Sequence, residues 1–73
     1  MEGIEEKIKI LLLKRKMNQT ELAEKLGMSM QNFNNKLRRE SFDGEELFKI
    51  AEALGAKYSY REWFTLNDTG EEI

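Results

Sequence analysis

Hydrophobic residues recur with the spacing of an α-helix in four successive segments, residues 3–17, 18–27, 30–38 and 43–55. The positions predicted to be buried are Ile4, Ile8, Leu11, Leu12 and Met17 in the first segment, Leu22, Ala23 and Leu26 in the second, Phe33 and Leu37 in the third, and Leu47, Ile50, Ala51 and Leu54 in the fourth. Each segment thus has one apolar stripe, and the pattern predicts a helical bundle over residues 1–56.

Short polar residues mark the ends of the predicted helices. Asn18 and Glu21 have the spacing of a capping box, and a second pair with this spacing begins the fourth helix. Gly27 suits the left-handed conformation that ends many helices, and only Met28 separates it from Ser29, a good N-cap. Two short helices therefore meet across a very tight turn.

The predicted third helix has an unusual composition. Phe33 and Leu37 form a narrow apolar seam, while nearly all other positions hold amides or cations: Gln31, Asn32, Asn34, Asn35, Lys36, Arg38 and Arg39. Asn is a poor residue for a helix interior, so three of them weaken the helix. Something other than stability favours these side chains, and this helix is the candidate functional element.

After Gly55 the hydrophobic period changes from that of a helix to two. Tyr58, Tyr60, Phe64 and Leu66 alternate with other residues, which predicts a strand over residues 58–66. Residues 67–70, Asn-Asp-Thr-Gly, form a turn signal, and only residues 71–73 remain to pair back. We expect one domain over residues 1–73, mainly α, with a C-terminal β extension over residues 57–73 that is a strand or a short hairpin.

Composition limits the chemistry. The 73 residues include no Cys and no His, so the strongest metal ligands and the usual nucleophile and general base are missing. We therefore expect a non-catalytic protein without metal, cofactor or small-molecule effector. The longest apolar run is four residues and the first residues are acidic, which predicts a cytoplasmic protein without a membrane partner.

The charge is divided unevenly along the chain, although the net charge is only −2. Residues 14–39 hold seven cations and two acids (7 − 2 = +5), whereas residues 41–73 hold three cations and eight acids (3 − 8 = −5). A basic middle segment that contains the amide-rich helix favours a polyanionic partner. These charges can also be ordinary solvated faces.

Two short helices joined by a glycine turn, the second with a polar outer face, form the arrangement that reads DNA in a helix-turn-helix. Gln and Asn can pair bidentately with the N6 and N7 of adenine, and nearby cations and amides can bind phosphates. At about 100° per residue, a helix that buries Phe33 and Leu37 points Gln31, Asn35 and Arg38 outward together.

Residues 18–31, NQTELAEKLGMSMQ, resemble the Cro/phage-repressor (XRE-like) type of helix-turn-helix DNA-binding domain. The resemblance rests on the Gln-x-Glu-Leu-Ala start, the glycine turn and the Ser-x-Gln opening of the recognition helix, and it extends over roughly residues 5–56. It implies a four- to five-helix repressor-like bundle that binds double-stranded DNA. Two departures are Lys36, at a position usually aliphatic, and Arg38-Arg39-Glu40 in place of a closing Glu-x-Gly. These departures leave open where the recognition helix ends.

Motif positions and residue chemistry together give a set of candidate DNA contacts. The base contacts are Met30, Gln31 and Asn35, with Asn34 able to reach a base or a phosphate; the phosphate contacts are Asn18, Gln19, Ser29, Asn32, Lys36, Arg38 and Arg39. For Met30 the alternative is packing against Leu26, and for the two arginines it is ion pairing with Glu40 or Glu45. The function implied is a transcription regulator, with a protein-interaction module, an antitoxin or anti-regulator, as the alternative.

One domain offers a single short recognition helix, so we expect a homodimer that reads an inverted repeat. A long strand that lacks a full partner needs another strand, and Tyr58, Tyr60, Trp63 and Phe64 are residue types enriched at interfaces. The sequence therefore predicts a dimer interface in the C-terminal segment. The alternative is that this segment folds back onto its own helices and covers Ile10 and Leu13.

Overall fold

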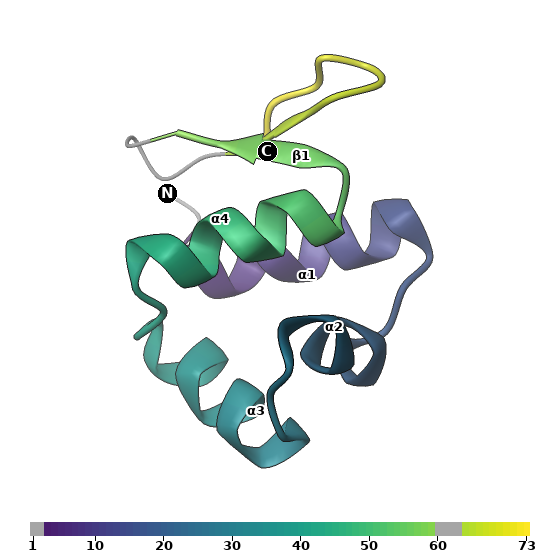
Figure 1. Ribbon diagram of the computed structural model, residues 1–73. Coiled ribbons are helices and arrows are strands. Elements are labelled where there is room, and N and C mark those ends of the chain that lie inside the picture. Colours follow the sequence, from purple (N-terminus) through teal and green to yellow (C-terminus); the bar gives the residue numbers. More distant parts are fainter. Residues whose placement is uncertain (1–2, 60–63) are drawn as a thin grey trace.

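The computed structural model describes residues 3–59 and 64–73, and within them it contains four helices and a small antiparallel hairpin (Figure 1). The elements are α1 (Ile4–Arg15), α2 (Gln19–Leu26), α3 (Met30–Arg39), α4 (Gly44–Ala53), β1 (Ala56–Tyr58) and β2 (Phe64–Leu66). Helices α2 and α3 lie at one end of the molecule and the hairpin at the other (Figure 1). The predicted fold class, mainly α with a short C-terminal hairpin, is confirmed.

The predicted helix caps are present. The side chain of Asn18 accepts a hydrogen bond from the N–H of Glu21 at 2.8 Å, and the Glu21 carboxylate accepts one from the N–H of Asn18 at 3.2 Å. Asp43 and Glu46 form the same reciprocal pair at the start of α4. Because these bonds satisfy amides that a helix leaves unpaired at its N-terminus, they fix where α2 and α4 begin.

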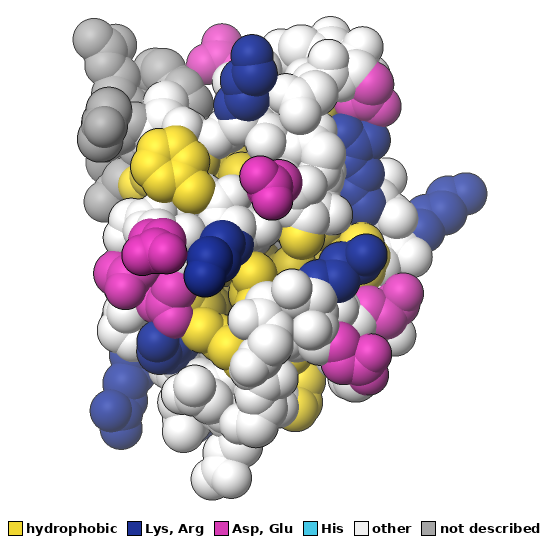
Figure 2. Space-filling model, viewed as in Figure 1, with side chains coloured by type: hydrophobic (Ala, Val, Ile, Leu, Met, Phe, Trp, Pro, Cys, Tyr) yellow, Lys and Arg dark blue, Asp and Glu magenta, His cyan; other side chains and the backbone are white. Residues whose placement is uncertain are grey.

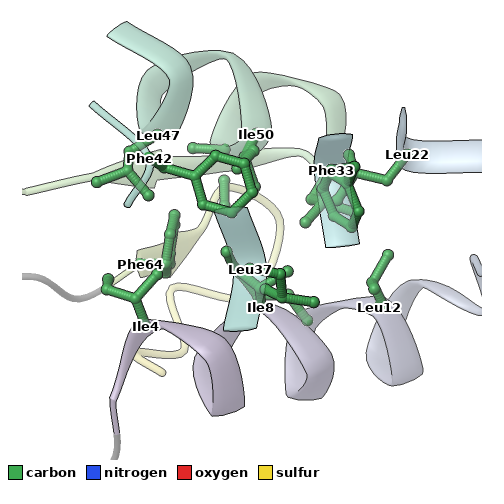
Figure 3. Close-up of a cluster of buried hydrophobic side chains, with 14 of the residues drawn as sticks. Ile4, Ile8, Leu12, Leu22, Phe33, Leu37, Phe42, Leu47, Ile50 and Phe64 are labelled. Carbon is green, nitrogen blue, oxygen red and sulfur yellow. The ribbon is translucent and has the colours of Figure 1, made fainter. Parts of the chain in front are cut away.

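The core lies between α1 and α4 and receives side chains from every element of the described chain (Figure 3). From α3 only Phe33 and Leu37 are buried, at 0% and 1% exposure. The ring of Phe33 packs against that of Phe42, in the segment before α4, with centroids 5.5 Å apart. These two side chains hold α3 on the bundle, as the predicted seam required.

Helix α3 ends at Arg39, and Glu40 follows it in the left-handed conformation, with φ 52°. Its carboxylate accepts a hydrogen bond from the N–H of Glu5 at 3.0 Å, in the first turn of α1. Gly3 allows this approach, since a Cβ there would lie 2.3 Å from a carboxylate oxygen of Glu40. Glu40 thus takes the place of a closing glycine and joins the end of α3 to the beginning of α1.

The prediction of one continuous strand over residues 58–66 was wrong, because the chain forms two three-residue strands that pair with each other. In this register Tyr58 faces Phe64 and Ala56 faces Leu66, so paired positions have the same parity. The alternation of side chains therefore continues from one strand to the next as if the strand were unbroken. Residues 59–63 contain no Gly, Pro or Asn that would signal a turn.

Strand β2 has neighbours on both sides. Phe64 and Ile73 exchange hydrogen bonds of 3.3 and 2.8 Å, and the N–H of Leu66 donates to the carbonyl of Glu71. The predicted turn at 67–70 thus returns the last residues along β2. The hairpin does not cover Leu13, which is 79% exposed, while Ile10 is half-buried.

Arg15, at the end of α1, joins the bundle to the C-terminal turn. Its Nε donates to the carbonyl of Leu54 at 2.7 Å and its Nη2 to that of Gly55 at 3.0 Å. Both Nη atoms also bind the carboxylate oxygens of Asp68, each at 2.9 Å. This hydrogen bonding lowers the pKa of Asp68 to about 2.

Among the described residues, none of the helices has the length and apolar character needed to span a membrane.

We predict that Asp68→Asn lowers the melting temperature near neutral pH and that its difference from the wild type shrinks as the pH falls from about 4 to 2. A carboxyl whose pKa is depressed on folding stabilises the native state above its unfolded pKa, and this contribution is lost as pH falls through the folded pKa. Thermal unfolding followed by circular dichroism across this range measures the effect. Glu24→Gln, at an exposed site, is the control; a pH-independent deficit for Asp68→Asn would contradict the assignment.

Lys16 provides a second test, since it ends α1 in the left-handed conformation with φ 54°. Such a conformation costs a residue with a Cβ about 1 kcal/mol, whereas glycine adopts it freely. We expect Lys16→Gly to stabilise the protein by about 0.5–1 kcal/mol in denaturant unfolding, and Lys16→Ala to change little. A destabilised glycine variant would show that the lysine side chain has a structural role.

Candidate nucleic-acid interface

The turn between α2 and α3 is closed by backbone hydrogen bonds at Gly27. This residue has φ 70°, and its N–H reaches the carbonyls of Ala23 and Glu24. The N–H of Met28 donates to the carbonyl of Ala23 at 2.9 Å. Ser29 then caps α3 by accepting the N–H of Asn32 at 3.1 Å. Since glycine adopts positive φ without strain, the chain turns sharply here and α3 follows directly on α2.

One face of α3 is buried and the opposite face is exposed. Phe33 and Leu37 point into the core, and α3 buries no other side chain. Six polar side chains are exposed: Gln31, Asn32, Asn34, Asn35, Arg38 and Arg39. Helical spacing places Gln31, Asn35 and Arg38 in one row away from the seam, so the outward direction predicted for them agrees with the burial of their neighbours.

Lys36 was predicted to contact a phosphate, but its side chain is engaged within the protein. It is half-buried, and its Nζ forms an ion pair and a hydrogen bond with the carboxylate of Glu46 on α4. Its position in the helix turns it toward α4, beside the seam of Phe33 and Leu37. Lys36 thus connects α3 to α4, and Leu37 fills the apolar position that the family pattern leads one to expect one residue earlier.

Met30 stands at the edge between α2 and α3. It is 37% exposed, and its sulfur lies 3.8 Å from the hydroxyl of Thr20, the second residue of α2. Thr20 is exposed beside it and was not among the residues singled out from the sequence. The closeness of Thr20 to Met30 depends on how α2 packs against α3, so the sequence around residue 20 does not reveal it.

The N-termini of α2 and α3 lie near each other, as the contact between Thr20 and Met30 shows. Asn18 and Ser29 use a side-chain oxygen each to cap α2 and α3, as described above. Gln19 is the first residue of α2 and is half-buried, and Asn32 is exposed in the first turn of α3. Free amides and the dipole at a helix N-terminus favour an anion, so these positions suit phosphate oxygens.

Part of the positive charge of the basic segment, residues 14–39, is neutralised by acids of the same chain. Lys14 pairs with Glu71 at 2.9 Å, while Arg15 and Lys36 bind the acids already described, all three partners coming from the acidic second half. Arg38 and Arg39 form no ion pair within the described residues, so their predicted alternative pairing with Glu40 or Glu45 is not observed there. Their charges remain exposed at the C-terminal end of α3.

The residues predicted for the dimer interface occupy different environments. Phe64 is completely buried in its own chain, so it leaves no surface for a partner. Tyr58 is half-buried and packs between Phe48 and Phe64, with ring centroids 5.6 and 5.4 Å apart. Tyr60 and Trp63 lie outside the described residues. The error over Phe64 arose because an aromatic residue in a predicted strand has the same pattern whether it faces a core or a partner.

No cluster of three acidic side chains that could hold a metal ion occurs in residues 3–59 and 64–73.

Comparison with curated proteins and comparison with solved structures gave no match. The family model of the Cro/C1-type HTH DNA-binding domain matches residues 7–58, more than half of the chain, and includes all of α2, α3 and α4. With the turn, the buried seam and the exposed amide face in place, the chain belongs to the Cro/C1-type helix-turn-helix DNA-binding family.

Proposed function

We propose that the protein is a cytoplasmic transcription regulator that binds specific duplex DNA sequences through α3 and reads an inverted repeat as a dimer. The observation that supports this most is the exposed row of Gln31, Asn35 and Arg38 opposite the buried Phe33 and Leu37. A helix fits into the major groove, where base edges present distinct patterns of donors and acceptors. Family membership supports DNA as the ligand.

In this proposal the first part of α3 reads bases. Gln31 and Asn35 pair with adenine, because a side-chain amide can donate to N7 and accept from N6 together. Met30, exposed at the edge of α3, contacts the methyl group of a thymine, and Asn34 reaches a base or a phosphate beside it.

Phosphate contacts fix the register of the helix on the duplex. Arg38 and Arg39 supply charge at one end of α3, and Asn18, Gln19, Ser29 and Asn32 supply amides and hydroxyls around the two helix N-termini. Lys36 is left out of this set because its ammonium group already binds Glu46.

The dimer follows from the size of the reading element. A single α3 contacts only a few base pairs, whereas two copies related by a two-fold axis read half-sites about 34 Å apart or a multiple of this distance. Selection of bound sequences from a random duplex pool tests the proposal: an inverted repeat with this spacing supports it, and enrichment of no sequence contradicts it.

We predict that Gln31→Ala costs about 1–3 kcal/mol of binding free energy on the selected site while leaving binding to a scrambled duplex unchanged. The amide contributes only where its adenine is present, so specificity falls and background binding stays. Titration of both duplexes, with circular dichroism to verify the fold, measures the difference. An unchanged preference for the selected site would remove Gln31 from the base contacts.

Arg38→Ala should act differently, because a phosphate contact contains no sequence information. We expect weaker binding to both duplexes and a slope of log K against log salt that is smaller by about one unit. Lys9→Ala, on α1 and paired with Glu5, is the control and should leave the slope unchanged. Wild-type protein that neither binds duplexes nor is retained on heparin would favour the protein-interaction alternative.

A further inference from the structure

An open groove of about 410 Å³ lies between α4 and β1, two elements that Figure 1 shows next to each other. Its apolar lining includes Phe48, Ala51, Ala56 and Tyr58, with Glu52 and Lys57 as its charged members. None of these residues belongs to the DNA-reading face. Hydrophobic side chains are exposed over this part of the surface among charges of both signs (Figure 2).

Phe48 is the main apolar feature of the groove. It is 50% exposed, although the same helix buries Leu47, Ile50 and Ala51 on its inner side. Its ring meets that of Tyr58 edge to face with centroids 5.6 Å apart, which holds it beside the groove. A fixed, half-exposed aromatic ring beside small alanine side chains is typical of an interface anchor and its pocket.

Strand β1 offers a second element of recognition. In the described residues the sheet order is β1-β2, and β2 pairs on its other side with the last residues of the chain. Strand β1 is therefore the edge strand, and it borders the groove through Ala56, Lys57 and Tyr58. An edge strand can pair with an antiparallel strand from another chain.

The charges of the groove show which partner fits. Glu52 and Lys57 are exposed and form no ion pair within residues 3–59 and 64–73. In a two-fold symmetric interface the same patch meets itself, so each charge must find its opposite within the patch. One acid and one base satisfy this requirement, since Glu52 of each copy can face Lys57 of the other.

We propose that this groove, which we call the α4–β1 groove, is the surface through which two copies of the chain associate, with Phe48 of each copy packed into the groove of the other. The proposal rests on the proposed function only in that a dimer is needed to read an inverted repeat. The groove lies between α4 and the hairpin strand β1, and α2 and α3 lie at the end of the molecule away from the hairpin (Figure 1). If the two-fold axis passes through the groove parallel to the line from the hairpin to α3, both α3 helices lie at the same end of the dimer.

Charge reversal provides the test. In the symmetric dimer of Glu52→Lys, the new lysine of each copy faces Lys57 of the other copy. In the dimer of Lys57→Glu, the new acid of each copy faces Glu52 of the other. Like charges repel in both cases, so each variant should dimerise about tenfold or more weakly than the wild type. When the two variants are mixed, every lysine faces a glutamate again. We therefore expect sedimentation to show two weakened variants that form a dimer on mixing, with circular dichroism confirming that both are folded.

The apolar contact is tested by Phe48→Ala, which should weaken the dimer by about tenfold to a hundredfold. Leu13→Ala is the matched control, because Leu13 is even more exposed but lies on α1 outside the groove. A wild-type chain that stays monomeric through the micromolar range, or a dimer that neither charge reversal nor Phe48→Ala weakens, would overturn the proposal.

The two proposals can fail separately. Binding of Phe48→Ala to a duplex with a single half-site depends on α3 and not on the groove, so it should equal that of the wild type. Loss of dimerisation with half-site binding retained supports the groove as the interface. A dimer that behaves as expected but binds no DNA refutes the proposed function and leaves the interface in place.

Discussion

The placement of α3 depends on the burial of two side chains, Phe33 and Leu37. The helix is ten residues long and contains three asparagines, so its intrinsic tendency to form is low. Burial of a phenylalanine and a leucine contributes about 1.5–3 kcal/mol each, which is comparable to the net stability of a domain of this size. The side chains of the outer face are therefore not needed to hold α3 on the bundle, and these positions can carry the amides and arginines that recognition requires.

Much of the fold follows from local physics that a sequence displays. Capping pairs such as Asn18 with Glu21, the glycine turn at Gly27 and the apolar seam of α3 act over four residues or fewer, so their pattern is readable and the structure agrees with it. The outward row of Gln31, Asn35 and Arg38 is predictable for the same reason, since helical geometry alone fixes their direction once the seam is known.

Features that depend on distant partners could not be predicted. Lys14, Arg15 and Lys36 were counted with the basic segment, yet each binds an acid from the second half of the chain, and composition does not reveal which cations are neutralised. The division of the predicted strand into β1 and β2 was hidden because paired residues share parity. Glu40 has no local signal for its bond to α1, 35 residues away.

The bond between Arg15 and Asp68 spans 53 residues of sequence and encloses the whole reading unit in one loop. Closing a loop of this length costs conformational entropy, and the packed bundle reduces this cost by holding residues 15 and 68 close together. The bond does not itself hold α2 and α3, which lie within the loop and are held by their own buried side chains, Leu22 of α2 and Phe33 of α3 among them. The coupling between the two ends of the molecule runs through the core instead: Phe33 and Leu37 belong to the same buried cluster as Leu11 and Leu54, so detaching the reading helix exposes side chains that also hold the rest of the domain together.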